Sequence, residues 1–512
     1  MKRAIPPGLL IAGTASGAGK TVASLGLIRA LRGLGLEVAC AKTGPDFIDT
    51  AFLSEACGSP AANLDAWMCR PGVNARPRAV PAGLARLRRR LLAPEPGSKP
   101  DLWVVEGAMG LYDGGPDGAG GAAQLARVLE LPVLLVLNVR GMGQSVAALA
   151  EGFLRHKPRG GSPRFLGLVC TQSGGAAHEK LLREALAPVL AREKLPLFGF
   201  LPRAGAPKLA SRHLGLVEAG EALPGLDLDG IGRWFAGHCD VAGILRALGV
   251  PLPQPAPAPA SSPRDLGPTP FFPFRRRGAR KLGRPRIGIA RDAAFSFCYA
   301  DLPALLAELG AEPVFFSPLA DAAPPEGCAG LYFPGGYPEL HGEALAANAP
   351  MLGALRGLAA RGLPVYGECG GYIYLMREVA VGGQRHALAG LLPLSCHMGD
   401  RLAALGYREA ESLPGWLPDV PGHSPPLVRG HEFHYARLDH AELPPECAPL
   451  WRVSDAAGVP RGLEGCRLGR VAGSWLHLYP EGSRRFWRAW LELTRAAARP
   501  DTKPQRPELP CP

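Results

Sequence analysis

The first half of the chain alternates short apolar runs with longer amphipathic stretches. The apolar runs predict buried strands at Gly8–Ala12, Leu36–Ala41, Leu102–Val105, Val133–Val139 and Phe165–Cys170. Helical periodicity fills several of the intervals, as at Lys20–Leu34 and His178–Arg192. Alternation of strands with helices predicts a mainly parallel sheet that helices cover on both faces.

The composition changes between Gly249 and Arg284, where PLPQPAPAPASSP is followed by FRRRGARKLGRPR. A segment this rich in proline and arginine predicts an interdomain linker. Its arginines could contact RNA, but a basic linker beside a domain edge is the simpler interpretation. The alternation then resumes, with strands expected at Arg286–Ala290, Pro313–Phe316, Gly330–Phe333 and Leu363–Tyr366. We therefore expect domains at residues 1–248 and 285–498, a linker at 249–284 and a disordered tail at 499–512.

Length and composition agree with this division. A chain of 512 residues is too long for one hydrophobic core, and its 47% hydrophobic and 20% charged residues are ordinary for a globular protein. The net charge of +12 is compatible with a polyanionic substrate, nucleic acid or an anionic membrane, and does not choose among them. The twelve cysteines are scattered without C-x-x-C spacing, which gives no support for zinc and favours a reducing cytoplasm. The apolar run Leu131–Val139 is far too short for a membrane span.

The segment GTASGAGKT, from Gly13 to Thr21, lies between the first predicted strand and the first predicted helix. Glycines let backbone amides approach phosphate oxygens, and the start of a helix favours negative charge. Lys20 would neutralise phosphate, and the Thr21 hydroxyl would bind Mg²⁺. The strict pattern needs glycine where this chain has Thr14, so an ordinary strand–helix turn is the alternative. The intact GKT between a strand and a helix favours nucleotide binding, with ATP contacts expected from Gly13, Thr14, Gly17, Gly19, Lys20 and Thr21.

Two acidic segments, KTGPDFID from Lys42 to Asp49 and EGAMGLYD from Glu106 to Asp113, follow predicted strands of the same sheet. Ligands of open α/β sheets bind at the carboxyl ends of the strands, so both segments are expected to face the phosphate loop. Carboxylates in this position can hold Mg²⁺ or orient a polar substrate. We expect Mg²⁺ ligands among Thr21, Asp46 and Glu106, and substrate contacts from Asp46, Asp49 and Asp113. Each aspartate could equally form a turn or cap a helix.

A candidate nucleophile, Cys369, lies in LPVYGECGGYIYL between a predicted strand and a helix. Gly367 and Gly371 flank the cysteine in G-x-C-x-G form, the cysteine version of a nucleophile elbow. Small neighbours permit the sharp turn that exposes the sulfur, and the following helix is expected to lower the thiol pKa. Most single cysteines are merely small buried residues, but the elbow makes a nucleophile the better interpretation here.

Three other segments could complete this second site. GSWLHLYP offers His477 as a base at the end of a late strand. FPGGYPELH ends another predicted strand, so the amide of Gly336, with that of Gly370, could form an oxyanion hole. The histidines of GHEFHY, His431 and His434, are only three apart and do not form H-E-x-x-H, so a substrate-contacting or structural loop is favoured over zinc.

Together, these motifs resemble the cobyrinic acid a,c-diamide synthase family of cobalamin biosynthesis. The resemblance runs from Gly13 to about Pro480 and also includes RHLGL and ARDAAFSF. It implies a P-loop NTPase-like parallel-sheet domain related to dethiobiotin synthetase, followed by a flavodoxin-like class I glutamine amidotransferase domain. The implied substrate is cobyrinate or metal-free hydrogenobyrinate, amidated at its a and c acetate side chains.

The resemblance also implies a carbon–nitrogen ligase mechanism. Cys369, with His477 as base, would release ammonia from glutamine, while Mg-ATP would convert a substrate carboxylate into an acyl phosphate that ammonia attacks. The implied partners are ATP, glutamine and a corrinoid polycarboxylate, without nucleic acid or membrane; the oligomeric state stays open, with a homodimer as one alternative.

The chain departs from the family pattern at several positions. Tyr479 replaces the acid usually found two residues after the catalytic histidine, which leaves the third catalytic member undetermined. Thr171 replaces an expected asparagine, which puts the contact to the nucleotide base in doubt. Cobyric acid synthase and nickel-sirohydrochlorin a,c-diamide synthase share this chemistry and are alternatives. An alternative of another class is a partitioning-type regulatory ATPase with an inactive amidotransferase-like module, although Cys369 and His477 are both present.

Overall fold

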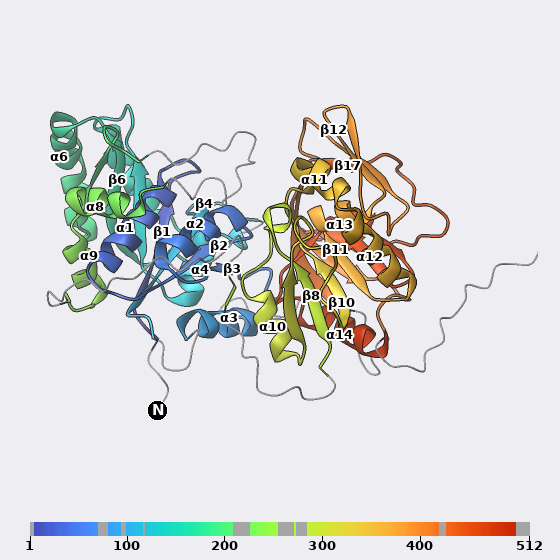
Figure 1. Cartoon of the computed structure of the whole chain (residues 1–512). Coiled ribbons are helices and arrows are strands. Elements are labelled where there is room, and N and C mark those ends of the chain that lie inside the picture. The colour runs from blue at the N-terminus through green and yellow to red at the C-terminus, as the bar shows by residue number, and fades with distance from the viewer. Residues whose placement is uncertain are drawn as a thin grey trace, which may run out of the picture. The chain divides into compact units, whose positions relative to one another are not determined.

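The computed structural model of the chain describes residues 5–69, 80–93, 99–115, 118–158, 160–207, 226–253, 271–272, 284–418 and 426–497 (Figure 1). Two compact units make up the chain, the first comprising Met1–Pro273 with Tyr299–Asp301 and the second Phe274–Cys298 with Leu302–Pro512. Most of the expected linker at 249–284, all of the expected tail and the RHLGL motif lie outside the described residues. Of the helices within those residues, none combines the length and apolarity needed to cross a membrane.

A seven-stranded parallel sheet forms the centre of the first unit, in the order β3-β2-β4-β1-β5-β6-β7. Its strands are β1 (Gly8–Gly13), β2 (Val38–Thr43), β3 (Ala62–Leu64), β4 (Leu102–Gly110), β5 (Val133–Asn138), β6 (Phe165–Ser173) and β7 (Leu197–Pro202). Every residue of β1 is buried, because the strand pairs with a neighbour on each side and both faces are covered. The predicted parallel sheet is therefore confirmed.

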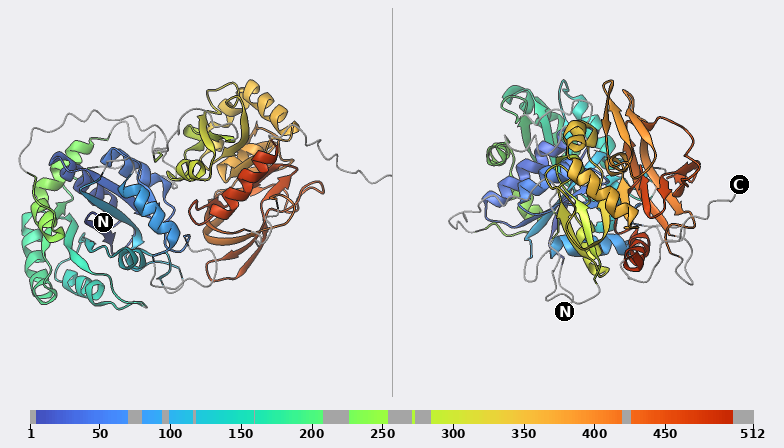
Figure 2. Two further views of the ribbon diagram at one scale, coloured as in Figure 1. Left: turned by 90° about the horizontal axis from the view of Figure 1, so that it is seen from below. Right: turned by 45° about the vertical axis from the view of Figure 1, so that its right-hand side comes forward.

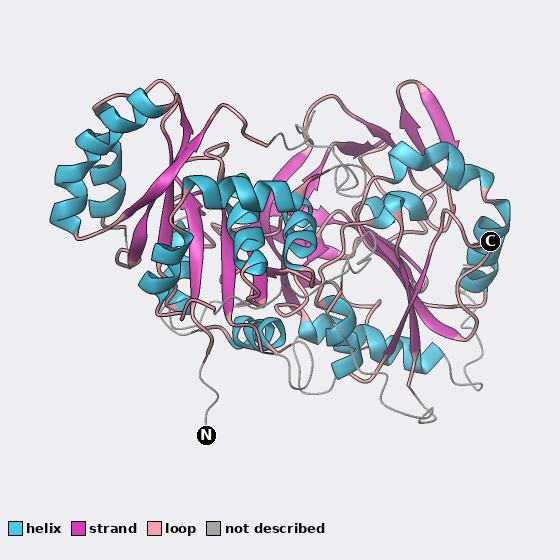
Figure 3. Ribbon diagram, turned by 60° about the vertical axis from the view of Figure 1, so that its left-hand side comes forward, coloured by secondary structure: helices cyan, strands magenta, loops and turns pink. Residues whose placement is uncertain are grey.

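Helices cover both faces of this sheet (Figure 3). They are α1 (Lys20–Gly33), α2 (Phe47–Cys57), α3 (Ala82–Leu92), α4 (Ala122–Leu129), α5 (Ser145–Arg155), α6 (Ala176–Glu193), α8 (Leu228–His238) and α9 (Val241–Leu248). Helix α1 packs against α2, α8 and α9, and α5 packs against α6. A side chain at Gly26 of α1 would lie 2.7 Å from Phe235 Cβ of α8, so glycine permits the close approach of these two helices.

A second, six-stranded sheet forms the centre of the other unit, in the order β20-β21-β11-β10-β8-β9. Its strands are β8 (Arg286–Ala290), β9 (Glu312–Phe316), β10 (Cys328–Phe333), β11 (Val365–Glu368), β20 (Cys466–Leu468) and β21 (Val471–Ser474), and all pairings are parallel except β20 with β21. The helical elements are η2 (Ala293–Phe295), α10 (Leu302–Glu308), η3 (Pro338–His341), α11 (Gly342–Ala347), α12 (Ala349–Ala360), α13 (Gly370–Leu375) and α14 (Arg484–Ala497). This α/β arrangement agrees with the expected class of the second domain.

Two smaller sheets in the second unit were not predicted. One has the order β13-β12-β14-β17 and the other β19-β18-β15-β16-β22. Their strands are β12 (Glu378–Val381), β13 (Gln384–Ala387), β14 (Ser395–Met398), β15 (Ala404–Ser412), β16 (Leu427–His434), β17 (Ala436–Leu438), β18 (Trp451–Asp455), β19 (Pro460–Glu464) and β22 (His477–Leu478). The aromatic helix α14, red in Figure 2, packs against β10 of the central sheet and against β16. The five-stranded sheet supplies one wall of the second candidate site.

Candidate active sites

The phosphate loop joins β1 to α1. Gly17 and Gly19 have φ angles of 73° and 89°, in the left-handed region that favours glycine. A side chain at Gly13 would lie 2.8 Å from Ala18 Cβ, so the loop folds tightly over the end of β1. The hydroxyl of Thr171, from β6, donates a hydrogen bond of 2.7 Å to the Ala18 carbonyl and fixes the loop from a strand that lies two places from β1 in the sheet. The backbone amides of the loop are thereby held in one curved conformation at the start of α1.

Lys20 lies buried at the first position of α1. Its Nζ donates a hydrogen bond of 2.9 Å to the Ala15 carbonyl, so the side chain folds back over the phosphate loop. Burial and the neighbouring Lys42 lower the pKa of Lys20, while Glu106, Asp49 and Asp113 oppose that shift. An anionic phosphate on this loop would add favourable charge beside the ammonium group.

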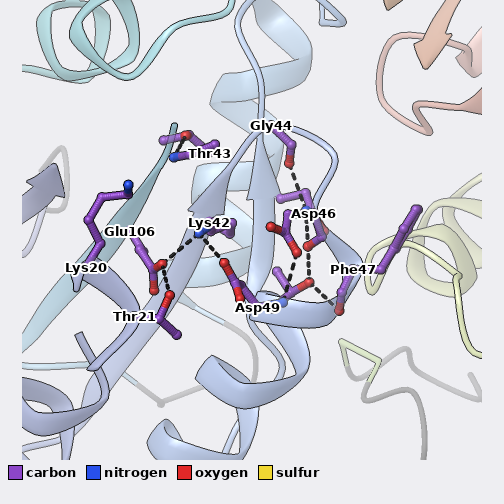
Figure 4. Close-up of polar contacts among 12 residues, drawn as sticks. Lys20, Thr21, Lys42, Thr43, Gly44, Asp46, Phe47, Asp49 and Glu106 are labelled. Atoms are coloured by element: carbon purple, nitrogen blue, oxygen red, sulfur yellow. Dashed lines mark hydrogen bonds and ion pairs between the residues drawn. The ribbon is translucent and has the colours of Figure 1, made fainter. Parts of the chain in front are cut away.

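A buried ionic cluster lies next to the phosphate loop (Figure 4). Lys42 Nζ is 2.5 Å from Asp49 Oδ2 and 2.6 Å from Glu106 Oε1, and Thr21 Oγ1 donates a hydrogen bond of 2.8 Å to the same Glu106 oxygen. Burial alone would lower the pKa of Lys42, but Glu106, Asp46 and Asp49 outweigh it and raise the pKa. Lys42 is therefore a fixed ammonium ion that joins the two acidic segments.

Asp46 begins helix α2. Its Oδ1 accepts a hydrogen bond of 2.9 Å from Asp49 N, as an N-cap aspartate does. The side-chain amide of Asn63, from β3, donates to the carbonyl oxygens of Gly44 and Asp46 and holds this loop against the sheet. Asp46 thus has the capping role that was an alternative to substrate contact, and its charge still adds to the field around Lys42.

Asp113 follows β4, the strand that also carries Glu106, and lies close to the phosphate loop. Its Oδ2 accepts a hydrogen bond of 2.8 Å from Gly110 N. A side chain at Gly110 would lie 2.7 Å from that oxygen and 2.9 Å from the Thr14 carbonyl, so Asp113 and the loop approach the same short stretch of β4. The structure therefore places all four acidic candidates, Asp46, Asp49, Glu106 and Asp113, around the carboxyl ends of β2 and β4, as the sheet rule predicts.

The chemistry of this cluster fits Mg²⁺. Glu106 Oε2 is buried and has no hydrogen-bond partner among the residues that the structure describes, while Glu106 Oε1 faces Thr21 and Lys42. Hard oxygen donors of this kind suit Mg²⁺, which usually takes few protein ligands and completes its shell with phosphate and water. Within the described part of the chain, no group of three or more His, Cys, Asp or Glu could hold a metal ion by itself.

The second site begins at Cys369, between β11 and α13. The residue has a φ of 48° and a ψ of −106°, an unusual conformation for a residue other than glycine, and strain of this kind occurs at nucleophile elbows. Its amide donates a hydrogen bond of 2.7 Å to Ser474 O, and its carbonyl accepts from Ile373 N. Its Sγ lies 3.8 Å from the carbonyl oxygen of Phe433 in β16.

Glycines bring the expected oxyanion-hole segments together. A side chain at Gly370 would lie 2.9 Å from Gly336 N and 2.7 Å from Gly336 O, so the two backbones are in close contact. Gly336 itself leaves no room for a side chain, because one would lie 2.1 Å from Ala294 O. At Gly335 a side chain would lie 2.3 Å from His477 Cε1. The loop before η3 therefore contacts both the elbow, at Gly370, and β22, at His477.

Cys369 and His477 are more deeply buried than the sequence suggested. Burial, with a smaller contribution from Glu339, raises the pKa of Cys369, and the amide of Gly370 opposes this only in part. The start of α13 thus lowers the thiol pKa as expected, but burial of the sulfur outweighs this effect and the net shift is upward. Burial and then His434 lower the pKa of His477 to about 3. These shifts favour a neutral thiol at Cys369 and a neutral imidazole at His477.

Three residues of these sites were not among the predicted site residues. Lys42 could have been suspected, since an ionisable residue near the end of an otherwise apolar strand needs a partner. Thr171 was noted only as a departure from the family pattern, and its place at the carboxyl end of β6 could have suggested its contact with the phosphate loop. His431 lies against His477 with ring centroids 4.8 Å apart, and no pattern in the sequence predicts that contact.

Family models match both halves of the chain. Residues 9–217 match the CobQ/CobB/MinD/ParA nucleotide binding domain, and residues 286–484 match the CobB/CobQ-like glutamine amidotransferase domain. A hydrogenobyrinate a,c-diamide synthase of Rhizobium meliloti (strain 1021) is 40% identical over 474 residues, covering 92% of this chain and 98% of the relative. The chain belongs to the a,c-diamide synthase family. The resemblance inferred from the motifs is confirmed.

Another member of the a,c-diamide synthase family, the hydrogenobyrinate a,c-diamide synthase of Rhodobacter capsulatus, is also 40% identical, over 485 residues and the same shares of both chains. A solved structure of a glutamine amidotransferase is 22% identical and covers 41% of this chain and 98% of its own, with a TM-score of 0.30; similarity this low supports no inference. Family membership confirms the expected amide-forming enzyme of cobalamin biosynthesis with a nucleotide-binding domain and a glutamine amidotransferase domain.

Proposed function

We propose that the chain converts the a and c acetate carboxylates of hydrogenobyrinate into carboxamides, with ATP as the energy source and glutamine as the nitrogen donor, in the cytoplasm. The observation that carries this proposal is the 40% identity to hydrogenobyrinate a,c-diamide synthases along 92% of the chain. Cobyrinate, the cobalt-containing form of the substrate, and nickel-sirohydrochlorin are the competing substrates.

The first site would activate the carboxylate. Mg-ATP would bind on the loop formed by Gly13, Thr14, Gly17, Gly19, Lys20 and Thr21, with Lys20 at the transferring phosphate. Thr21, Glu106 and Asp46 would hold Mg²⁺, which supplies positive charge for the phosphate oxygens when it is bound. The substrate carboxylate oxygen would attack the γ-phosphorus, forming an acyl phosphate and releasing ADP. Asp49 and Asp113 would orient the carboxylate side chain.

A buried cation helps to explain how acidic residues can receive an acidic substrate. Bare aspartates would repel a polycarboxylate, but Lys42 offsets part of the charge of Asp49 and Glu106 before any ligand binds. Lys20 and bound Mg²⁺ would offset the negative charge that remains when the substrate carboxylate enters. Ammonia would attack the acyl carbon, phosphate would leave, and the amide would form.

The second site would supply that ammonia. His477 would take the thiol proton as Cys369 Sγ attacks the side-chain amide carbon of glutamine, and would return it to the departing nitrogen. The amides of Gly336 and Gly370 would stabilise the oxyanion. Water would then hydrolyse the thioester to glutamate. Because both groups are neutral at rest, proton transfer would accompany the attack on bound glutamine rather than precede it.

Direct turnover tests the proposal. Purified protein is incubated with Mg-ATP, glutamine and one of three substrates: hydrogenobyrinate, cobyrinate or nickel-sirohydrochlorin. Mass spectrometry then follows the replacement of carboxylates by carboxamides. Two amidations of hydrogenobyrinate that depend on both ATP and glutamine are expected. Amidation of nickel-sirohydrochlorin alone would overturn the substrate assignment, and ATP hydrolysis without any amide would overturn the enzyme class.

A further inference from the structure

The strand β16 places His431 against His477. The two residues are opposite each other in the antiparallel pairing of β16 with β22, and both side chains are buried. Their rings are nearly parallel, with centroids 4.8 Å apart and planes inclined by 15°. Cross-strand pairs at this separation are in direct contact, so His431 covers one face of the candidate base.

The same strand also reaches the nucleophile. Phe433 presents its carbonyl oxygen 3.8 Å from Cys369 Sγ. His434 stacks on Trp475, with ring centroids 4.4 Å apart and planes inclined by 13°. Residues of the GHEFHY motif therefore contact Cys369, His477 and the segment that carries His477. The motif is part of the second site rather than a separate loop.

No acid lies at the usual position to orient His477. The residue two positions later is Tyr479, which is buried and whose amide donates to Arg429 O. The half-buried Glu464 accepts hydrogen bonds of 2.7 Å from Ser474 Oγ and from Trp475 N, so it fixes the backbone that leads to His477. The ring contact from His431 is a different kind of constraint, because it acts on the plane of the imidazole itself.

We propose that His431 is a positioning residue for glutamine hydrolysis, which holds the plane of the His477 ring by stacking against it. The inference rests on the proposed roles of Cys369 and His477. General-base catalysis needs the accepting nitrogen within hydrogen-bond reach of the proton, and rotation of an imidazole about its side-chain bonds moves that nitrogen away. Because the flat ring of His431 covers one face of the His477 ring, only a narrow range of such rotations of His477 is possible.

Electrostatics agree with this arrangement. Burial and then His477 lower the pKa of His431 well below its usual value, and burial lowers the pKa of His477. Two neutral rings can stack without repulsion, whereas two imidazolium ions at this separation in a dry site would repel each other. The pair therefore stays in contact in the state that accepts the proton.

Flat and non-flat replacements at His431 test the proposal. His431→Phe and His431→Tyr keep an aromatic face, whereas His431→Leu and His431→Gln remove it. Glutamate release measures glutaminase kcat and KM, and synthesis driven by ammonium salts is measured in the same preparations. Thermal unfolding identifies variants that have lost their fold. Any one folded member of each class suffices for the comparison.

The Leu and Gln variants are expected to lose about 10- to 100-fold in glutaminase kcat, with little change in KM, because general-base positioning contributes on this scale. The aromatic variants are expected to keep kcat within about threefold of the wild type on the same reasoning, and ammonium-driven synthesis is expected to be unchanged throughout. Wild-type kcat in the Leu and Gln variants, or equal losses in both classes, would overturn the positioning role while leaving the proposed function intact. A wild-type protein that releases no glutamate would overturn both.

Discussion

The ammonium group of Lys42 lies 2.6 Å from Glu106 Oε1, and both side chains are almost fully buried. The same nitrogen lies 2.5 Å from Asp49 Oδ2, and the same glutamate oxygen accepts from Thr21. One cation thus joins β2, β4, α1 and α2 at the edge of the sheet where ligands bind. Removing Lys42 would leave two buried carboxylates without their cation, so the cluster ties the stability of the first unit to the geometry of its site.

The Lys42→Met variant is expected to lower the free energy of unfolding of the first unit by about 3–5 kcal/mol, because Glu106 and Asp49 then stay buried without their cation. Adding Glu106→Gln to that variant is expected to restore part of the loss, since one uncompensated carboxylate disappears. Urea unfolding without nucleotide measures both. Arg192→Met, in an exposed pair with Glu151, is the matched control and should change stability little. Equal effects of Lys42→Met and Arg192→Met would contradict the coupling.

The fold of the first unit and the centre of the second followed from the sequence. Buried parallel strands are nearly continuous apolar runs, and the predictions at Gly8–Ala12 and Val133–Val139 each differ from the observed strands by one residue at the C-terminal end. The antiparallel strands could not be predicted in the same way. Strands such as β13 (QRHA) and β19 (PRGLE) are short, polar and largely exposed, so they carry no apolar periodicity.

Only part of each candidate site could be predicted. GKT and the cysteine elbow could be recognised in the sequence, because in each motif the turn and the reactive side chains lie within a few residues of one another. The ion pairs of Lys42 and the stacking of His431 on His477 depend on which strands pair and in what register, and β22 has only two residues. The raised thiol pKa depends on burial by distant segments, which the adjoining helix does not reveal.

The nucleophile assignment predicts a separation of activities. Cys369→Ala is expected to abolish synthesis from glutamine while synthesis from ammonium salts continues near the wild-type rate, because ammonia bypasses the thioester. Amide formation is measured with each nitrogen source. Cys396→Ala, at another buried cysteine of the same unit, is the matched control. Loss of both activities in a folded Cys369→Ala protein would contradict the division of labour.

The phosphate-loop assignment predicts the opposite pattern. Lys20→Ala is expected to reduce synthesis by about 10²–10³-fold with either nitrogen source, the scale of one contact to a transferring phosphoryl group. Glutamate release at Cys369 should keep its basal rate. Lys180→Ala, on α6 and exposed, controls for the loss of a positive charge from the same unit. Near-normal ammonium-driven synthesis by Lys20→Ala would refute the role of Lys20.

The second unit is expected to respond to pH through His434. Burial lowers the pKa of His434 to about 4, below its usual value near 6.5 in the unfolded chain. Its contribution to stability is therefore full above about pH 6.5 and is lost as pH falls toward 4, because the unfolded chain binds the proton first. The destabilisation caused by His434→Gln should thus be about 1–2 kcal/mol smaller at pH 5 than at pH 8. Urea unfolding at both pH values measures this destabilisation, and the exposed His440→Gln is the control. If the destabilisation caused by His434→Gln is the same at both pH values, His434 is not held in its neutral form by burial.

Two N-cap aspartates separate a catalytic role of Asp46 from its structural one. Asp46 caps α2 and Asp227 caps α8, each by accepting a hydrogen bond from the backbone three residues on. Asparagine caps a helix about as well as aspartate, so Asp→Asn at either position preserves the helix and removes one charge. Only Asp46 adjoins the Lys42 cluster, where that charge is proposed to serve Mg²⁺ and the incoming carboxylate.

Asp46→Asn is therefore expected to lower synthesis by about 10²-fold or more with either nitrogen source, as loss of a positioned charge at a phosphoryl-transfer site does. Asp227→Asn should leave synthesis unchanged, and both variants should keep basal glutamine hydrolysis. Amide formation, ADP release and glutamate release are measured together.

A regulatory ATPase would behave differently, because it would hydrolyse ATP in the absence of any tetrapyrrole and form no amide. Robust wild-type ATP turnover that is indifferent to every carboxylated tetrapyrrole tested would refute the synthetase. Unchanged synthesis in Asp46→Asn would instead show that Asp46 acts only as a helix cap.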